Sequence, residues 1–503
     1  MEAPAVTKTV GHFISGAELG ADDSARYGEI YDPARGEVQA RLAFADQAII
    51  DKAVAVAKKA HKTWSATPLG KRAEVFFAFR ALVKQHADDF ARIVSSEHGK
   101  VVSDAGGEVT RALEVIDFAC NLTHHMKGEI SENVSNTIDT YSIKQSLGVC
   151  VGITPFNFPM MVPVWMYAPA IAAGNAFILK PSERDPSAAM LMGKLWKEAG
   201  LPDGVFQVVH GDKFAVDALI EHPDVASVAF VGSTPIAHYV YEKSAKFGKR
   251  VQALGGAKNH MVVMPDADMD TAADAAVSAA YGSAGQRCMA ISTSVSVGGA
   301  GDALMAKIRE RIAGLKVGPG SDPKTDMGPV VSAQARDKIK GYIAQGETEG
   351  ASLLEDGREL RVLDYENGFF VGPTLFDDVK TNMTIYKEEI FGPVLINLRV
   401  DTLDQALELI EKNPYGNGTS IFTRSGTAAR KFQTEVQAGM VGINVPIPVP
   451  VGYFSFGGWK ASLFGDLNIY GPDGFKFYTR SKVVTSRWND ANAGMNLGFP
   501  THK

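Results

Sequence analysis

The sequence predicts an α/β protein that contains a doubly wound parallel sheet. Short apolar, β-branched runs alternate with helical stretches from residue 148 to residue 256, and the alternation resumes in a second unit from about 257 to 450. Short strands separated by helices are typical of a parallel sheet that is covered on both faces. The chain has 503 residues, too many for one compact core, so we expect two or three domains.

Residues 45–125 predict helices. The segments AIIDKAVAVAKKAHKTW and KRAEVFFAFRALVKQHADDFARIVSSEHG place apolar side chains at helical spacing. Gly99 follows the second segment and is expected to cap the end of that helix.

The doubly wound domain is predicted to follow this helical region. Its expected helices lie at about 186–199, 213–221 and 235–247, and its expected strands are GVCVGIT, FILK, FQVVHG, VASVAFVGS and KRVQALGG. Ligands bind at the carboxyl ends of the strands in such sheets, so we expect the binding loops there.

The second α/β unit is predicted to begin at HMVVMP, with helices at 271–284 and 302–315 and a strand in STSVSVGG. Residues 446–451, PIPVPV, are expected to be extended, because three prolines exclude both a helix and a central strand.

Composition and charge exclude several classes of protein. A net charge of −6 argues against a nucleic-acid partner, since phosphate neutralisation needs clustered cations. The uncharged stretch between Lys144 and Lys180 is interrupted by prolines, so no membrane span is expected. Three scattered cysteines form neither a disulfide framework nor a metal site, and the N-terminal residues lack the features of a signal peptide. We therefore expect a cytoplasmic protein without a metal.

Cys288 is the candidate nucleophile. It ends the segment YGSAGQRCMA, whose small residues let the backbone approach a ligand closely. Arg287 is expected to place a positive charge beside the sulfur and so to favour the nucleophilic thiolate. The local sequence equally allows a buried, inert cysteine. Cys120, in a predicted helix, and Cys150, in a predicted strand, are expected to be structural.

Asn157 is the candidate oxyanion donor. It lies in the rigid loop TPFNFP, between two aromatic residues and two prolines. A side-chain amide held in such a loop can donate a hydrogen bond to a developing oxyanion. The alternative is a loop asparagine that bonds its own backbone.

Two further segments are candidates for cofactor binding. ILKPSER, residues 178–184, places Lys180 and Glu183 just after a strand, where a carboxylate can accept the hydroxyls of a ribose. FVGSTPIA, residues 230–237, supplies Ser233 where a strand turns into a helix, a natural phosphate site. Either segment alone is also compatible with an ordinary strand–turn–helix connection.

Taken together, these motifs resemble those of the aldehyde dehydrogenase superfamily. The PFNFP loop, KPSE, FVGS, the Gly-Gln-Arg-Cys nucleophile and EEIFGPV occur in that family's order and approximate spacing, over nearly the whole chain. The segments GKRVQ, GAKNH, QRCMA, PIPVPV and FGDLNIYG are similar to those of one branch, the CoA-acylating methylmalonate-semialdehyde dehydrogenases.

The resemblance implies a chain of three parts. These are an NAD-binding domain at 1–125 and 144–254, a catalytic domain at 255–470, and a small oligomerisation arm at 126–143 and 471–503. Homodimers or homotetramers are the usual state of such proteins. The resemblance also implies that NAD contacts Thr154, Phe156, Lys180, Glu183, Arg184, Ser233, Gly255, Glu389 and Phe391. Glu183 favours NAD over NADP, because a 2′-phosphate would face a carboxylate.

One departure from the superfamily indicates the fate of the acyl group. Hydrolytic members carry a glutamate that activates water in an E-L-G-G-K type motif, and Leu254 stands at that position here. Leucine cannot accept a proton, and general-base catalysis is typically worth about 10²–10⁴-fold in rate. We therefore expect the thiol of coenzyme A, rather than water, to take the acyl group from Cys288.

Two arginines are predicted to bind an acid group on the substrate. Arg287 adjoins the nucleophile, and the branch places a second arginine at Arg111. Arg111 shares one helix face with Val115, Phe118 and Leu122, so it is expected to point inward. Arginine binds a carboxylate with two parallel hydrogen bonds. The alternative for Arg111 is an exposed ion pair with Glu108 or Glu114.

The predicted function is oxidative decarboxylation of methylmalonate semialdehyde and malonate semialdehyde to propionyl-CoA and acetyl-CoA. One alternative is a hydrolytic NAD-dependent aldehyde dehydrogenase that uses another base and releases a free acid. A second alternative is a binding or structural protein that has kept the fold and lost catalysis.

Overall fold

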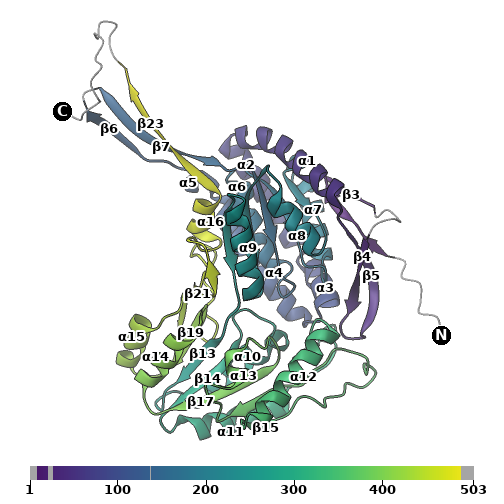
Figure 1. Cartoon of the computed structure of the whole chain (residues 1–503), viewed down its shortest axis with the longest axis vertical. Coiled ribbons are helices and arrows are strands. Elements are labelled where there is room, and N and C mark those ends of the chain that lie inside the picture. The colour runs from purple at the N-terminus through teal and green to yellow at the C-terminus, as the bar shows by residue number, and fades with distance from the viewer. Residues whose placement is uncertain (1–7, 21–25, 136, 489–503) are drawn as a thin grey trace.

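The computed structural model describes residues 8–20, 26–135 and 137–488. Figure 1 shows two α/β units stacked end to end and a narrow arm that projects from one end. The expected α/β architecture, with a doubly wound first unit, is confirmed.

The predicted helical region contains a run of consecutive helices. They are α1 (Gln47–Ala66), α2 (Leu69–Gln85), α3 (Ala87–His98), α4 (Val102–Cys120) and α5 (Leu122–His125). The Asp46 carboxylate caps α1 by accepting the Ile49 N–H at 2.9 Å. Gly99 caps the end of α3 with φ 94°, a left-handed conformation that glycine adopts without strain, so this prediction is also confirmed.

The first sheet has a parallel centre with antiparallel strands at both edges. Its strands follow the order β22 (Leu463–Phe464), β12 (Arg250–Leu254), β11 (Val225–Val231), β8 (Val149–Ile153), β9 (Ala176–Lys180), β10 (Phe206–Val208), β2 (His12–Ile14) and β3 (Ala17–Leu19). Helices α1, α8 (Lys213–Glu221) and α9 (Thr234–Lys246) cover one face. Helices α6 (Met161–Ala172) and α7 (Ser187–Glu198) cover the other face, backed by α2, α3 and α4.

The second sheet is also mostly parallel. Its order is β15 (Ser352–Glu355), β16 (Thr374–Asp377), β17 (Val394–Val400), β14 (Ile291–Val297), β13 (Asn259–Val263), β19 (Gly418–Phe422) and β20 (Met440–Ile443). One face carries α10 (Met269–Tyr281), α11 (Ala300–Gly314), α12 (Ala333–Thr348) and α13 (Thr384–Lys387). The other face carries α14 (Leu403–Lys412) and α15 (Gly426–Glu435).

The helix predicted at 271–284 ends earlier than expected. Helix α10 stops at Tyr281, and a 3-10 turn follows at Gly282–Gly285, in which Ser283 and Ala284 adopt positive φ. Gly282 breaks the helix, and the left-handed residues redirect the chain toward Cys288. The expected extended segment at 446–451 contains neither helix nor strand.

The N-terminal strands were not predicted. Strands β1 (Thr9–Val10), β5 (Glu37–Phe44) and β4 (Arg26–Asp32) form a separate small sheet, and β2 and β3 complete one edge of the first sheet. These strands are short or half exposed, so their sequences lack the continuous apolar runs of the central strands.

The arm is a three-stranded antiparallel sheet that stands clear of the body in Figure 1. Its order is β23 (Thr479–Arg487), β7 (Ile138–Ser146) and β6 (Ile130–Ser135). Strands β23 and β7 pair along their length, so the two segments assigned to the arm lie side by side.

One part of the expected domain division differs from the structure. Strand β22 pairs with β12 of the first sheet, and helix α16 (Gly471–Phe477) packs on α6. Residues 463–478 therefore belong with the first unit rather than with the second unit or the arm. Phe475, Phe477 and Tyr478 are buried in the core beneath that sheet, which explains the placement.

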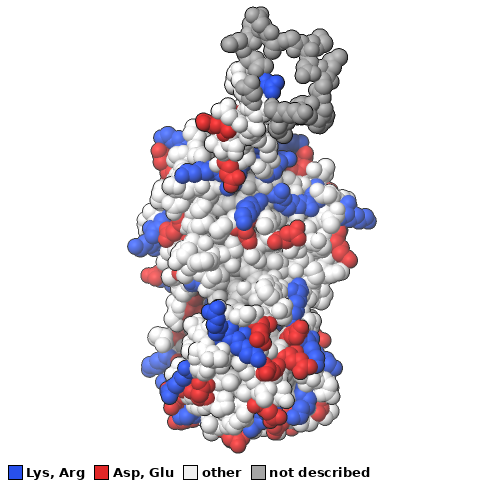
Figure 2. Space-filling model, turned by 90° about the vertical axis from the view of Figure 1, so that its left-hand side faces the viewer, with Lys and Arg blue, Asp and Glu red and all other residues white. Residues whose placement is uncertain are grey.

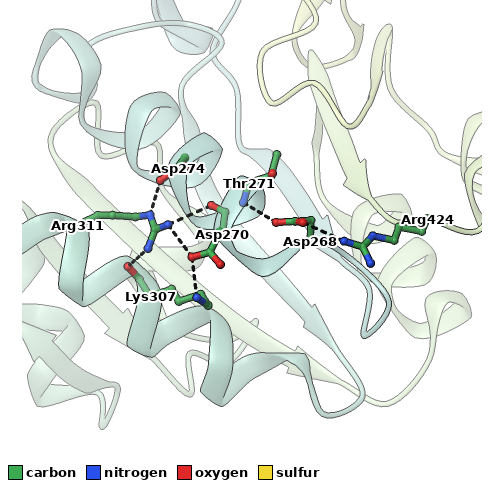
Figure 3. A network of polar contacts seen from close by, with 7 residues as sticks. All are labelled: Asp268, Asp270, Thr271, Asp274, Lys307, Arg311 and Arg424. Carbon is green, nitrogen blue, oxygen red and sulfur yellow. Dashed lines mark hydrogen bonds and ion pairs between the residues drawn. The ribbon is translucent and has the colours of Figure 1, made fainter.

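A surface network joins α10 to its neighbours (Figure 3). Asp268 caps α10 by accepting the Thr271 N–H at 3.0 Å, and it pairs with Arg424 at 2.9 Å. Arg311 of α11 reaches both Asp270 and Asp274 of α10. These carboxylates are largely exposed, so salt screens their ion pairs. The network therefore orients the helix ends and adds little to the stability of the fold.

Charges of both signs are interspersed over the face shown in Figure 2. Within the residues that the structure describes, no helix combines the length and apolar character needed to cross a membrane. The same residues contain no group of three or more His, Cys, Asp or Glu side chains placed to hold a metal ion.

Candidate active site

The candidate site lies at the point where the first sheet reverses its strand order. The chain runs from β8 outward to β9 and β10 on one side, then returns to β11 and β12 on the other. The loops after β8 and β11 therefore separate and leave a crevice, the usual ligand position in such sheets. A cavity of about 250 Å³ lies there, between these loops and the second unit.

Most of the predicted site residues meet at this cavity, although they are far apart in the sequence. Its lining includes Phe156, Asn157, Ser233, Gly255, Cys288, Glu389 and Phe391. Phe391 adopts φ 57°, which is strained for a bulky residue, and its ring lies edge-on to Phe156 at 5.8 Å between centroids. Strain of this kind persists where the surroundings fix a residue for function.

Four predicted cofactor residues lie outside this lining. Thr154 directly follows β8 and is buried, and its Oγ1 has no hydrogen-bond partner among the described residues. The Lys180 Nζ lies 3.4 Å from Glu183 Oε2. Glu183 and Arg184 line a neighbouring cavity of about 470 Å³, on the side toward the N-terminal sheet.

The Cys288 thiol is protonated in this state. Burial raises its pKa to about 12, and the negative charge of Glu389 adds to that effect. The positive charge of Arg287 lowers the pKa of the thiol, as expected, but by less than burial raises it. The Arg287 guanidinium donates to the Asp104 carboxylate at 2.6 Å, and Arg287 lines one small cavity together with Cys288 and another with Val101.

Two asparagines that sequence reasoning missed hold the nucleophile loop. The Asn259 amide donates to the carbonyl oxygens of Cys288 and Ala290, both at 2.9 Å, and the Asn417 amide donates to the Cys288 carbonyl at 3.2 Å. Asn259 is part of the GAKNH segment, but nothing in that segment alone indicates its contact with Cys288. These bonds fix the backbone of Cys288 and so the position of its thiol.

A buried ion pair, also missed, holds the Asn157 loop. The Lys100 ammonium donates to the Asn157 carbonyl at 2.6 Å and to Glu108 at 3.0 Å. Glu108 accepts the N–H groups of Met160 and Met161 at 2.7 and 2.9 Å. Both charged side chains are fully buried, so the pair is isolated from water. The segment EHGK that supplies Lys100 looks like an ordinary helix end.

Arg111 is half-buried, and its guanidinium is bonded on both sides. Its Nη1 pairs with Glu114 at 2.8 Å, which is one of the two partners expected in the alternative. Its Nη2 donates to the carbonyls of Val449 and Pro450 at 3.0 and 2.7 Å. The Tyr470 hydroxyl donates to the same Pro450 carbonyl at 2.9 Å, so Arg111 and Tyr470 share one backbone acceptor.

Leu254 ends β12 and is buried in the apolar core. The glycines after it make the loop close on Glu389, because a Cβ on Gly256 would come within 2.3 Å of Glu389 Oε2. The Ala257 N–H donates to Glu389 at 3.0 Å. Burial raises the pKa of Glu389 to about 7, despite that hydrogen bond.

The arrangement combines a thiol, a side-chain amide and a carboxyl group that titrates near neutrality around one cavity. A thiol and an amide donor are the components of acyl transfer through a covalent intermediate. The position after β11 and β12, with small residues and a helix N-terminus, suits a dinucleotide.

Comparison with known proteins gives one consistent result. The model of the aldehyde dehydrogenase family matches residues 21–484. A malonate-semialdehyde dehydrogenase of Pseudomonas aeruginosa is 54% identical over 496 residues, 98% of this chain and 99% of that protein. The mitochondrial methylmalonate-semialdehyde/malonate-semialdehyde dehydrogenase [acylating] of Homo sapiens is 45% identical over 97% of this chain and 91% of its own length.

Two solved structures are similar over almost the entire chain. The methylmalonate-semialdehyde dehydrogenase of Oceanimonas doudoroffii has a TM-score of 0.95 at 52% identity, covering 96% of this chain and 99% of that one. A structure from Sinorhizobium meliloti 1021, described as complexed with NAD, has a TM-score of 0.96 at 52% identity, covering 97% and 99%.

Proposed function

Because the chain belongs to the aldehyde dehydrogenase family, we propose that it oxidises malonate semialdehyde and methylmalonate semialdehyde with NAD and passes the acyl group to coenzyme A. The observation that carries the proposal is that Cys288 lines the cavity while Leu254, one residue before Gly255 of the same lining, is apolar and buried. A thiol is present to form a thioester, and the position of the water-activating glutamate is apolar.

The first step is addition of Cys288 Sγ to the aldehyde carbon, after the thiol loses its proton. The Asn157 amide and the Cys288 backbone N–H donate to the oxygen as it becomes negative. Loss of one such donor costs about 2.7–4 kcal/mol of transition-state stabilisation. Lys100 and Glu108 serve this step by holding the loop that carries Asn157.

The residues around the cavity fit a nicotinamide dinucleotide. Gly255 and Gly256 leave a cradle that a side chain would fill, and Thr154 Oγ1, outside the cavity lining, has no hydrogen-bond partner among the described residues. Glu389, Phe156 and Phe391 would hold the nicotinamide half, Ser233 at the N-terminus of α9 the diphosphate, and Lys180, Glu183, Arg184 and Thr154 the adenosine half. When bound, NAD accepts the hydride that leaves the substrate carbon, and an acyl thioester stays on Cys288.

A carboxylate β to the thioester is then released as carbon dioxide. The electron pair of the breaking bond moves into the thioester carbonyl, and protonation of the resulting enolate gives the shorter acyl group. The coenzyme A thiolate attacks this thioester, releases Cys288 and leaves as acetyl-CoA or propionyl-CoA.

Arg111 would bind the substrate carboxylate. Its guanidinium shares the Pro450 carbonyl with the Tyr470 hydroxyl, and a substrate carboxylate can replace Glu114 as its partner. Arg287, for which the same role is predicted, is held by Asp104, so a substrate carboxylate must compete with Asp104 for it.

We propose an NAD-binding domain at 1–125, 144–254 and 463–478, a catalytic domain at 255–462, and an oligomerisation arm at 126–143 and 479–503. The exposed apolar side chains of the arm, such as Ile130 and Val483, support its role in a homodimer or homotetramer. A reducing, cytoplasmic compartment suits an enzyme whose nucleophile must remain a free thiol.

The test is NADH formation from malonate semialdehyde with and without coenzyme A, with the product identified by mass. Sustained turnover only with coenzyme A, yielding acetyl-CoA, is the expected result. Equal turnover without it, yielding a free acid, would refute the proposed acyl acceptor. A Cys288→Ser variant is the control and should form no NADH in either condition.

The hydrolytic alternative has one observation in its favour. Glu389 lines the cavity with Cys288, and its pKa of about 7 suits a general base. If Glu389 activates water, NADH forms without coenzyme A, and Glu389→Gln removes that activity. If Glu389 instead contacts NAD, the variant raises the KM for NAD and leaves the requirement for coenzyme A unchanged.

A further inference from the structure

A separate cavity of about 540 Å³ lies where the arm joins the body. Its walls come from α1, the first turn of α2, the carboxyl end of β7 and the start of β23. β7 ends at Ser146, just before β8 begins at Val149, so the cavity is at the amino end of β8. The active site is at the other end of that five-residue strand, about 17 Å of strand length away. The two cavities share no lining residue.

Positive charge dominates this second cavity. Its lining includes Arg72, Lys144, Arg480 and Lys482, and contains no Asp or Glu. Within the described part of the chain, none of these four side chains forms an ion pair, whereas many other cations of the protein do. Four unpaired cations around one cavity repel each other, and an anion between them removes that repulsion.

Arg72 is the least expected of the four. The residue is only 6% exposed, and its Nε and Nη1 donate to the carbonyls of Thr67 and Ala172 at 2.9 and 3.2 Å. Its Nη2 has no hydrogen-bond acceptor among the described residues. Burial lowers the pKa of Arg72, because its charge has lost water without gaining a carboxylate. Buried charges in proteins are ordinarily paired, so this guanidinium lacks its counter-ion.

His61 adds a neutral hydrogen-bonding group to the same wall. Burial and the neighbouring charge of Arg480 lower its pKa, so its ring is uncharged at neutral pH. Its Nε2 lies 2.9 Å from the Ser146 hydroxyl. The wall is thus cationic and polar, with no large apolar surface that would favour a hydrophobic ligand.

We propose that this cavity binds a small anion through a phosphate or diphosphate group that carries at least two negative charges. The Nη2 of Arg72, with the side chains of Arg480, Lys144 and Lys482, offers donors and charge to several phosphate oxygens at once. A single carboxylate would leave most of the positive charge uncompensated. The site does not depend on the proposed reaction, because no residue of the active site contributes to it.

The test is calorimetric titration of the full-length protein with pyrophosphate at constant ionic strength, in the presence of saturating NAD. NAD fills the active-site cavity and so removes binding there. Saturable binding is expected, together with a rise in melting temperature that equal ionic strength from sodium chloride does not produce. Inorganic phosphate in a parallel titration distinguishes a diphosphate site from a monophosphate site, and saturable binding of either supports the proposal.

The variant Arg480→Ala with Lys482→Ala removes two of the four charges. Affinity for pyrophosphate should fall by about tenfold or more. The control variant Arg487→Ala with Lys476→Ala removes two cations from the same region outside the cavity, and its affinity should match that of the unaltered protein. Both variants should form NADH normally without pyrophosphate, which shows that they fold.

Equal affinity of both variants would overturn the proposal, since the anion would then bind elsewhere. Absence of binding would also overturn it. A change of oligomeric state in the Arg480→Ala, Lys482→Ala variant alone, without any pyrophosphate binding to the unaltered protein, would assign the cavity to an acidic segment of a second copy instead.

Discussion

The reactivity of Cys288 depends on the charges and the burial around one sulfur atom. Burial and Glu389 hold its pKa at about 12, so the resting thiol is protected from adventitious oxidation and alkylation. The carboxyl of Glu389, whose own pKa is about 7, carries much of its charge at neutral pH. Anything that removes this charge or displaces Glu389 should activate the thiol.

The variant Glu389→Gln should therefore accelerate alkylation of Cys288. Removal of the negative charge lowers the pKa of the thiol, and more thiolate is present at any pH below it. In the unaltered protein, the rate with iodoacetamide should rise about tenfold per pH unit from pH 8 to pH 10, where Glu389 is already ionised and the thiol pKa still lies above the range. The rate is measured by mass of the Cys288 peptide. A slower reaction of the variant at pH 8 would contradict this account.

A second prediction at this scale concerns the buried ion pair of Lys100 and Glu108. Lys100→Met should lower stability by about 3–5 kcal/mol, because Glu108 is left as an unpaired buried charge. The double variant Lys100→Met, Glu108→Leu should regain only part of that stability, because the unpaired charge is gone but the Met160 and Met161 N–H groups and the Asn157 carbonyl lack partners. Both should form NADH at least about tenfold more slowly, because the Asn157 carbonyl loses its donor.

Denaturant unfolding measures the loss of stability, and kcat measures the loss of catalytic rate, so the two effects are distinguished. The exposed pair partner Asp274 in Figure 3 offers a control, and Asp274→Asn should change neither quantity measurably. If the double variant recovers kcat together with stability, Lys100 and Glu108 serve folding alone and do not position Asn157.

At the scale of elements, the loops after the strands determine the site. The loop after β12 passes close to Glu389, and a side chain at position 256 would displace the Glu389 carboxylate. The strands beneath were predictable, because β8, β9, β11 and β12 are continuous apolar runs. For the loops, the sequence predicted which segments carry functional motifs but not which residues contact each other. Their mutual contacts depend on the packing of two domains, which no local pattern encodes.

Gly256→Ala should therefore impair cofactor binding. The added methyl group displaces Glu389 or the loop and narrows the cavity, so the KM for NAD should rise at least about tenfold. Gly341→Ala is a matched control: it lies inside α12 with open space around it, and alanine there should stabilise by about 0.5–1 kcal/mol. Steady-state NADH formation over a range of NAD concentrations measures the difference. An unchanged KM of Gly256→Ala for NAD would show that the space beside Gly256 is not needed for NAD binding.

At the scale of the whole molecule, sequence and structure agree on the architecture and differ in how the parts are held together. The order of strands and helices follows from hydrophobic periodicity, and the placement of Cys288 and Asn157 follows from motifs. Lys100, Glu108, Asn259 and Asn417 could not be found in the same way, because their partners are distant in sequence. Arg287 shows the converse: its neighbour in sequence is Cys288, but its partner in space is Asp104.

The exposed apolar residues of the arm lead to a prediction about the oligomeric state. Ile130 and Val483 are each 67% exposed on a thin sheet that has little core of its own. Ile130→Asp with Val483→Asp should convert the oligomer to a smaller species in light scattering, because a charge opposes burial of this face. Leu363→Asp, at an exposed apolar residue outside the arm, should leave the mass unchanged. If the arm variant keeps its mass, the arm is not the assembly surface.

In the proposed reaction, the acyl group remains bonded to Cys288 as a thioester until coenzyme A accepts it. Intact mass spectrometry after mixing the enzyme with malonate semialdehyde and NAD, without coenzyme A, tests this most directly. The account predicts about one NADH per active site in a burst, an acyl adduct on the Cys288 peptide, and loss of the adduct when coenzyme A is added. Continuous NADH formation with no adduct and a free acid product would contradict it.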